Sequence, residues 1–406
     1  AKTLLMAGAL QKTHQKIVIA VPNLYYANQL VDDFLNILPS EQVHLFPVDE
    51  VLSAEMAFSS PEARADRVSA LNFLMTANAG IVVVPVAGLR KYLPTKETWQ
   101  NAQLHWEIGT EVEPEILAQR LVLMGYERQS MVGKPGEFSI RGSIIDVYPL
   151  NAEYPVRVEL FDVEIDSIRY FEADTQRSLE NLEEVTISPM TDLVFSKADM
   201  NHGMMRLQDA LEKRLATAKD QTETDFLEEY FGQLLSSWEQ GIPTENAHYY
   251  TDFLYQQKTT LLDYLPENSL LFVDDYSRMM ETEREIAREE AEWQTLKIEE
   301  MRVFSEQTFG VDFHDQLRKT ARNTTFFSLF QKGMGNLRFQ EVHNFQYRSM
   351  QQFFGQMPLL KAEVDRWQKQ NQTVVVFVPT KERIQKVEEL FQDFDIPDRK
   401  STRLNS

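Results

Sequence analysis

Two short runs near the start of the chain are apolar at every position. Residues 17–21 and 80–84 are rich in β-branched side chains, and a proline, Pro22 or Pro85, follows each run. Strands without a polar face are typical of a parallel sheet that helices cover on both sides. A helical pattern over about residues 24–38 lies between the two runs. The first hundred residues therefore predict an α/β domain.

The second half of the chain returns to this alternation after a polar, helical stretch over about residues 195–265. Residues 269–273 are apolar on every side, and a long charged pattern over 279–300 predicts a solvated surface helix after them. A last apolar run at 372–379 and an amphipathic pattern over 381–394 predict one more strand and helix. The sheet is therefore expected to return in the second half.

Residues 136–179 show a different pattern, in which apolar and polar positions alternate as in half-buried strands. Along residues 156–161 the even-numbered positions are aliphatic and can supply a core. The odd-numbered positions are Arg157, Glu159 and Phe161, so an aromatic ring is expected outside, beside an arginine. Arginine and aromatic side chains are enriched at interface centres. This predicts a docking surface, although strand faces also carry exposed Phe or Arg without any function.

The same segment resembles the second domain of the transcription-repair-coupling-factor family, a domain shared with the excision-repair protein UvrB. The match consists of Gly-Glu-Phe at 136–138, Arg-Gly at 141–142, Ile-Asp-Val-Tyr-Pro at 145–149 and Arg-Val-Glu-Leu-Phe-Asp at 157–162, and it continues to residue 179. Residues 43–74 also resemble the family, with Phe-Pro, Glu-Val-Leu and Ser-Pro before Arg67, which is expected to open a helix. The resemblance covers nearly residues 1–398.

The resemblance implies that the chain recruits the excision-repair protein UvrA. In the family, an arginine before a glycine, a second arginine that opens the next strand and an aromatic residue four positions later contact UvrA. Here these positions are Arg141, Arg157 and Phe161. The parent protein would be an ATP-dependent translocase on double-stranded DNA that displaces stalled RNA polymerase, with ATP and magnesium bound outside residues 1–406. We expect this chain itself to be non-catalytic and to hold no cofactor.

The resemblance also implies a fold. It is an α/β, helicase-like Rossmannoid domain, the degenerate half of an NTPase, into which a small α+β UvrA-binding domain is inserted, and the start of a further small α/β domain follows. The expected boundaries are 1–112 for the UvrB-like domain 1A, 113–194 for the UvrA-binding domain 2, 195–340 for the UvrB-like domain 1B, 341–400 for a partial third domain and 401–406 for a non-native tail.

A working nucleotide site is not expected. A phosphate-binding loop needs G-x-x-x-x-G-K-[ST], and Gly133-Lys134 fails because Pro135 follows. Lys2 and Thr3 are the remaining candidates, and Asp274 and Asp275 stand where the resemblance places the Asp-Glu pair of an active helicase. The shorter second carboxylate predicts a degenerate site. A simpler interpretation is that these aspartates cap the following helix.

Two alternatives to the recruiting role stay open. One is a UvrB-type ATPase or helicase subunit of the excinuclease, which would need a tyrosine-rich hairpin for DNA; residues 47–61 offer only Phe58. The other is a structural brace, in which Phe161 packs against a neighbouring domain of the same protein.

Composition narrows these choices. With 406 residues and 43% apolar content, the chain can bury more than one core. The net charge of -21 argues against duplex DNA binding by the chain as a whole. There are no cysteines, and the seven histidines are scattered, so no metal site is expected. No apolar run is long enough for a membrane span and no signal peptide is visible, so we expect a cytoplasmic monomer.

Overall fold

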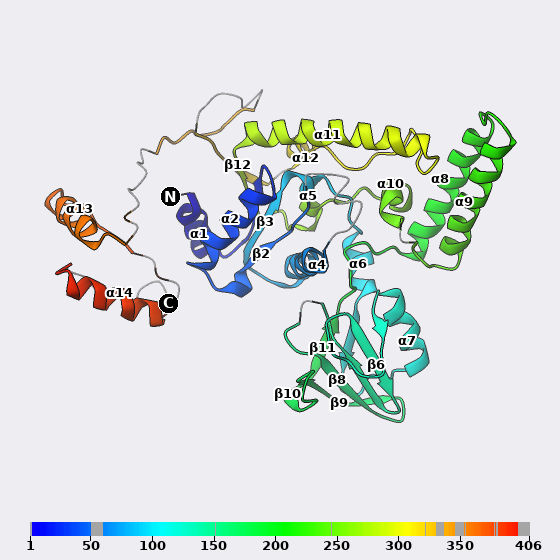
Figure 1. Cartoon of the computed structure of the whole chain (residues 1–406), viewed down its shortest axis with the longest axis horizontal. Helices are drawn as coiled ribbons and strands as arrows, with labels where there is room; N and C mark the ends of the chain where they lie inside the picture. Colours follow the sequence, from blue (N-terminus) through cyan, green and yellow to red (C-terminus); the bar gives the residue numbers. More distant parts are fainter. Residues whose placement is uncertain are drawn as a thin grey trace.

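The computed structural model describes residues 2–49, 60–150, 152–244, 246–320, 322–329, 337–345, 353, 355–376, 378 and 381–396. A sheet covered by helices occupies the middle of Figure 1, with a strand-rich unit on one side of it and a pair of long helices on another. None of the described helices is long and apolar enough to cross a membrane.

The central sheet has five parallel strands in the order β13-β12-β1-β3-β2. In β1 and β3 every residue is buried, as the apolar runs predict. The chain thus brings strands from both halves into one parallel sheet, and the mixed α/β class is confirmed. The strands are β1 (Lys16–Val21), β2 (Val43–Leu45), β3 (Gly80–Pro85), β12 (Leu270–Asp274) and β13 (Asn323–Phe327).

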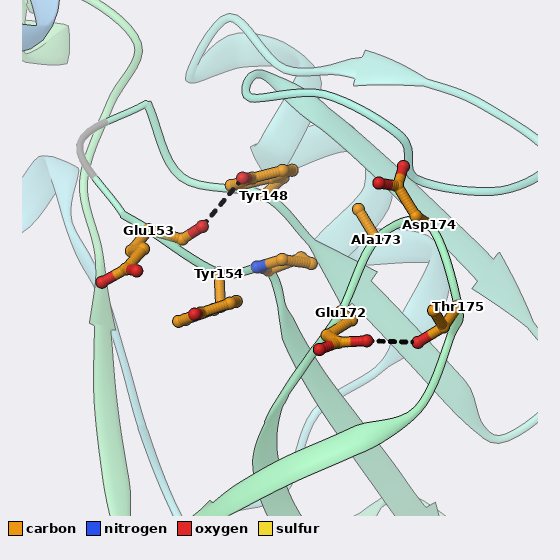
Figure 2. Close-up of a pocket in the computed structure, with 8 residues that line it drawn as sticks. Tyr148, Glu153, Tyr154, Glu172, Ala173, Asp174 and Thr175 are labelled. Carbon is orange, nitrogen blue, oxygen red and sulfur yellow. Dashed lines mark hydrogen bonds between the residues drawn. The ribbon is translucent and has the colours of Figure 1, made fainter.

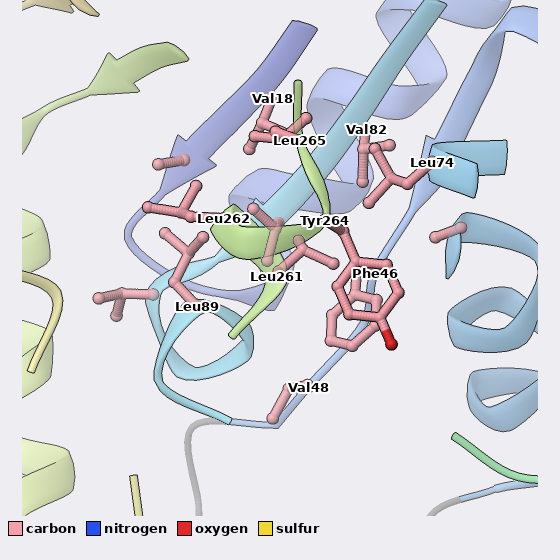
Figure 3. Close-up of a cluster of buried hydrophobic side chains, with 14 of the residues drawn as sticks. Val18, Phe46, Val48, Leu74, Val82, Leu89, Leu261, Leu262, Tyr264 and Leu265 are labelled. Carbon is pink, nitrogen blue, oxygen red and sulfur yellow. The ribbon is translucent and has the colours of Figure 1, made fainter. Parts of the chain in front are cut away.

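Helices cover both faces of this sheet. One face packs on α1 (Lys2–Thr13) and α2 (Leu24–Leu35), through a core that includes Met6, Leu30 and Phe34. The other face carries a second apolar core, in which Val18 and Val82 meet Leu261, Leu262 and Tyr264 from a segment far along the chain (Figure 3). The helices on that side are α4 (Pro61–Thr76), α5 (Val86–Arg90), α11 (Tyr276–Glu299) and α12 (Phe313–Lys319).

The expectation that Arg67 opens a helix is wrong. Helix α4 begins at Pro61, because the Ser60 hydroxyl accepts a hydrogen bond from the Ala63 N–H at 3.1 Å and proline suits the first helical turn. Arg67 lies inside this helix and is buried.

The strand-rich unit is a six-stranded sheet in the order β10-β9-β8-β7-β6-β5. Only the β5–β6 pair is parallel. Helix α7 (Pro114–Leu123) packs on one face through Leu117 and Leu121. The strands are β5 (Glu127–Arg128), β6 (Glu137–Arg141), β7 (Ile144–Val147), β8 (Val156–Phe161), β9 (Glu164–Phe171) and β10 (Ser178–Leu182).

A two-stranded ribbon connects this unit to the rest of the chain. Strand β4 (Leu104–Glu107) enters the unit, and β11 (Glu184–Ile187) leaves it, and the two pair antiparallel with Trp106 opposite Val185. Leu104, Trp106 and Ile187 are buried in the core of the strand-rich unit. The incoming and outgoing chains therefore lie side by side.

The remaining described elements are helical. Helices α8 (Lys197–Leu215) and α9 (Gln221–Glu239) pack around a core that includes Leu207, Phe231 and Trp238. Helix α6 (Lys96–Ala102), α10 (Thr251–Leu254), α13 (Met357–Lys369), α14 (Lys381–Asp393) and the 3-10 turns η1 (Ser40–Gln42), η2 (Ala247–Tyr250) and η3 (Leu261–Tyr264) complete the set.

The strand predicted at 372–379 is not formed by its described residues, 372–376 and 378. Val374, Val375 and Val376 are exposed. A strand needs a neighbouring backbone to satisfy its N–H and C=O groups, and none of the described strands pairs with this segment. The helix predicted at 381–394 is confirmed as α14. The expected tail at 401–406 lies outside the described residues.

A buried ion pair holds the outgoing chain of the strand-rich unit against α4. The Arg67 Nε lies 2.8 Å from Asp192 Oδ1, and Arg67 Nη1 also donates to the Pro47 carbonyl at 2.9 Å. Lys91 Nζ lies 3.7 Å from the other Asp192 oxygen. Burial alone would raise the pKa of Asp192, but the charges of Arg67 and Lys91 outweigh it and hold this pKa below its ordinary value.

Asp192→Asn is expected to lower the free energy of unfolding by about 3 kcal/mol at pH 7, because it leaves the buried Arg67 without its counter-charge. Since the pKa of Asp192 is depressed in the folded state, its stabilisation is present above the unfolded pKa of about 3.9 and is lost as pH falls through the folded-state value. Urea unfolding at several pH values measures both effects.

The matched control is Asp209→Asn, at an exposed position on α8. This control is expected to unfold like the parent protein at every pH. A difference between parent and Asp192→Asn that stayed constant from pH 7 to pH 3 would contradict the assignment.

Candidate partner-binding surface

The face of the six-stranded sheet that α7 does not cover carries a row of polar side chains across four strands. Ser139 on β6 stands opposite Asp146 on β7, Asp146 opposite Arg157 on β8, and Arg157 opposite Arg169 on β9. Alternation puts the aliphatic neighbours of these residues into the core on the other side. The register of the sheet therefore brings acidic and basic groups together.

Asp146 is the centre of this row. Its side chain has no exposed surface, and it accepts hydrogen bonds from two arginines. Arg157 binds it with two donors, Nε at 2.6 Å and Nη2 at 2.8 Å, and Arg141 adds Nη2 at 2.7 Å. Charge-assisted, two-pronged contacts of this kind are strong and fix the plane of the guanidinium. One buried carboxylate thus positions both arginines.

Arg157 is held by two further groups. Its Nη2 donates to Gln176 Oε1 at 2.7 Å, and its guanidinium lies 4.2 Å from the centre of the Phe171 ring. Hydrogen bonding to Asp146 raises the pKa of Arg157 above its ordinary value. Only 11% of its side chain is exposed, compared with 40% for Arg141.

Gln176 belongs to a tight turn that follows β9. Its backbone is left-handed, with φ at 58°, and its N–H donates to the Glu172 carbonyl at 2.8 Å. The side-chain Nε2 donates to the Ala173 carbonyl at 2.7 Å, which leaves Oε1 directed at Arg157. The turn over residues 172–177 therefore carries one wall of the arginine site.

Phe161 lies on the same face as Arg157, at the end of β8. A two-residue loop, Asp162-Val163, joins β8 to β9, and Asp162 adopts the left-handed conformation with φ at 60° that such a loop requires. Phe161 is 79% exposed, and Val163 beside it is also exposed. Four residues of strand place Phe161 about 13 Å from Arg157 along β8.

An ion pair occupies the space between Arg157 and Phe161. Arg169 binds the Glu159 carboxylate and also donates to Ser167 Oγ at 3.2 Å. Hydrogen bonding from Arg169 lowers the pKa of Glu159 below its ordinary value. Glu159 therefore stays ionised at neutral pH. The surface alternates positive and negative charge before it ends at the exposed Phe161 and the Asp162-Val163 loop.

The three residues predicted to bind a partner are thus placed differently. Arg141 and Arg157 meet on Asp146, whereas Phe161 stands apart from them at the hairpin tip. Sequence reasoning missed Asp146 and Gln176. Asp146 is the polar residue of an otherwise apolar strand, Ile-Ile-Asp-Val, and pairing that strand with β8 places it opposite Arg157.

The strand-rich unit that carries this surface matches a known domain family. The family model of the UvrB interaction domain matches residues 104–193, which include the whole six-stranded sheet. The transcription-repair-coupling factor of Bacillus subtilis (strain 168) is 37% identical over 396 residues, which cover 98% of this chain and 34% of that protein. Nearly the whole chain therefore matches part of a transcription-repair-coupling factor.

A second relative agrees with this assignment. The transcription-repair-coupling factor of Staphylococcus aureus (strain bovine RF122 / ET3-1) is 31% identical over 405 residues, with 98% of this chain and 34% of that protein covered. The chain therefore spans about a third of the length of the curated transcription-repair-coupling factors that it matches.

The residues considered for a degenerate nucleotide site bind one another or nearby groups. Lys2 Nζ lies 2.5 Å from Asp274 Oδ2, and Thr3 Oγ1 donates to Asp33 Oδ2 at 3.1 Å. Asp275 precedes α11, and its carboxylate accepts from the Arg278 N–H at 3.4 Å, which is the capping role considered as the simpler interpretation.

Two related expectations concern metals and DNA. Across the part of the chain that the structure describes, no group of three or more His, Cys, Asp or Glu residues is arranged to hold a metal ion. Most of the segment 47–61, where a DNA-clamping hairpin would be required, lies outside the described residues.

Arg157→Ala is expected to lower the free energy of unfolding of the strand-rich unit by about 3 kcal/mol. The fully buried Asp146 would then keep only the half-exposed Arg141 as counter-charge. Urea unfolding followed by the CD of the sheet measures the loss. Arg177→Ala, at an exposed position of the same turn, serves as the control and is expected to be neutral. Equal midpoints for Arg157→Ala and the parent protein would contradict this account of Asp146.

Proposed function

We propose that this chain is the UvrA-recruiting region of a transcription-repair-coupling factor. The observation that carries the proposal is an exposed Phe161 on the same sheet face as two arginines that one buried carboxylate holds in place. This face lies within the segment that the UvrB interaction domain matches. The match of nearly the whole chain to transcription-repair-coupling factors favours this role over a UvrB-type helicase subunit.

The arrangement suits recognition of an acidic and apolar patch. Arg157 is ordered before any partner arrives, so little conformational entropy is lost when it is covered. Arg141 keeps 40% of its side chain exposed, and its guanidinium retains donors beyond the one that binds Asp146. Phe161 adds apolar area that gains free energy when it leaves water. The arginines thus supply orientation, and the ring supplies contact area.

The competing brace would require Phe161 to pack against another part of the same protein. Among the described residues Phe161 is not covered in that way, since 79% of its surface is exposed. A brace between parts of the described chain is therefore not supported, and the match to the UvrB interaction domain favours binding to UvrA.

The finer description of the fold is also part of the proposal. The five parallel strands, covered by helices on both faces, fit the helicase-like Rossmannoid half of an NTPase. We assign domain 1A to 1–112, the UvrA-binding domain to 113–194, domain 1B to 195–340 and a partial third domain to 341–400. The pairing of β4 with β11 supports a single insertion into the parallel-sheet domain.

The nucleotide-dependent activity is proposed to lie elsewhere in the longer relatives. Lys2 and Asp274, the candidate phosphate- and magnesium-binding residues, form an ion pair with each other. ATP, magnesium, RNA polymerase and double-stranded DNA would then be bound by the two thirds of those proteins that this chain does not cover. This chain is proposed to act as a cytoplasmic monomer without a cofactor.

Phe161→Ala is expected to weaken binding to UvrA by about 2 kcal/mol, or roughly 30-fold, because an interface aromatic ring is lost. Isothermal titration calorimetry with UvrA measures this change. The stability of the chain is expected to stay the same, since the ring makes no core contact.

Tyr25→Ala is the matched control, because Tyr25 is an exposed aromatic residue on α2 of the central domain. It is expected to bind UvrA like the parent protein. If Phe161→Ala kept its full affinity for UvrA, the site assignment would be wrong.

ATP with magnesium is expected to leave the thermal unfolding midpoint of this chain unchanged. A ligand that binds the folded state at 100 times its Kd would add about 2.7 kcal/mol and raise the midpoint measurably. Differential scanning fluorimetry tests this, with a P-loop ATPase as the positive control. A midpoint that rises with ATP concentration in this chain and not in Asp274→Asn would show that Lys2 and Asp274 belong to a site that still binds nucleotide, and would contradict this prediction.

A further inference from the structure

A cavity of about 350 Å³ opens beside the docking face, at the end of the six-stranded sheet. Figure 2 shows the rings of Tyr148 and Tyr154 on one side of it and Glu172, Asp174 and Thr175 on the other. The Tyr148 hydroxyl donates to the Glu153 carbonyl at 2.9 Å, and the Thr175 hydroxyl donates to Glu172 at 2.6 Å. Two separate chain segments are therefore tied into definite walls.

The chemistry of the lining is that of a cation site. Glu172 and Asp174 bring carboxylates to one wall, whereas the Glu153 carboxylate points away from the cavity (Figure 2). The lining includes no lysine, arginine or histidine. The faces of the two tyrosine rings carry negative charge density, which attracts ammonium and guanidinium groups. A cavity of this size lies at the low end of the range for ligand pockets and admits the end of a long basic side chain.

The cavity and the arginine site share one structural element. The turn over residues 172–177 lines the cavity with Glu172, Asp174 and Thr175. On its other side the same turn places Gln176 against Arg157. The Gln176 N–H donates to the Glu172 carbonyl at 2.8 Å, which links the two sides through one backbone hydrogen bond. The cavity and the arginine site therefore lie on the two sides of one turn.

We propose that this cavity receives a basic side chain of UvrA, an arginine or a lysine, and so forms a second contact of opposite sign beside the arginine pair. The inference rests on the proposed function and deepens it. The docking face would then present positive charge at Arg141 and Arg157 and negative charge at Glu172 and Asp174. A partner would have to match both signs in the correct order, which improves specificity more than affinity.

The first experiment measures binding to UvrA by calorimetry with the 406-residue chain. The double variant Glu172→Gln/Asp174→Asn removes two charges with little change in shape and is expected to bind about tenfold more weakly. The control, Glu180→Gln/Glu183→Gln, removes the same charge from exposed positions outside the cavity and is expected to bind like the parent protein. Equal stabilities in urea exclude unfolding as the cause.

The second experiment tests the cavity without UvrA. N-acetyl-arginine amide and N-acetyl-lysine amide are added to the chain labelled with 13C-tyrosine, with neutral N-acetyl-citrulline amide as the matched probe. The cationic probes are expected to shift the NMR signals of Tyr148 and Tyr154 with a Kd on the order of millimolar, whereas citrulline does not. The shifts are expected to disappear in Glu172→Gln/Asp174→Asn, and the stronger probe identifies the preferred side chain.

The outcomes separate this inference from the proposed function. One outcome is that the parent and the double variant bind UvrA equally well and that no probe shifts the tyrosine signals. In that case the cavity assignment is overturned, and the recruiting role stands. If the tyrosines respond to the cationic probes but the parent does not bind UvrA, the cation site stands and UvrA is the wrong partner. If citrulline shifts the tyrosines as strongly as arginine does, the cavity does not select for charge, and the inference is wrong.

Discussion

A carboxylate that has left water entirely needs positive partners at hydrogen-bonding distance, because its own desolvation is costly. Asp146 meets this requirement with Arg141 and Arg157, and the sheet register places all three on one face. Neither arginine could be held so near the other without the negative charge between them. Gln176 and Phe171 then complete the enclosure of Arg157. The arrangement of the proposed recognition surface is therefore a consequence of how one buried charge is neutralised.

The three residues assigned from the family resemblance differ in exposure, so they would contribute to partner binding in different ways. Arg157 is mostly enclosed, so it contributes to the integrity of the sheet as well as to any contact. Arg141 is the more accessible cation, and Phe161 is the accessible ring. Between them the Glu159–Arg169 pair keeps the surface nearly balanced in charge. A partner must therefore recognise a pattern of charges and not a simple basic patch.

Much of this could be read from the sequence, and the failures have physical causes. Strand alternation correctly placed Phe161 outside, because a period of two needs no knowledge of the rest of the fold. It could not show that the Arg157 side chain is enclosed, since that depends on Gln176, which lies 19 residues further along the chain. Arg67 was placed at a helix start because the Ser60-Pro61 cap was overlooked. The segment 372–379 has the composition of a strand, but composition does not supply the neighbouring backbone that a strand requires.

The ribbon of β4 and β11 has a consequence for how such a chain can evolve. Because the two crossings between the units are hydrogen-bonded to each other, their ends lie about 5 Å apart, the ordinary spacing of adjacent strands. A surface loop of the parallel-sheet domain could gain or lose the whole strand-rich unit with almost no change in its own backbone path. The buried Arg67–Asp192 ion pair adds a further link between the outgoing chain and α4. Geometry of this kind would let the strand-rich unit be inserted into different host proteins without changing the fold of either.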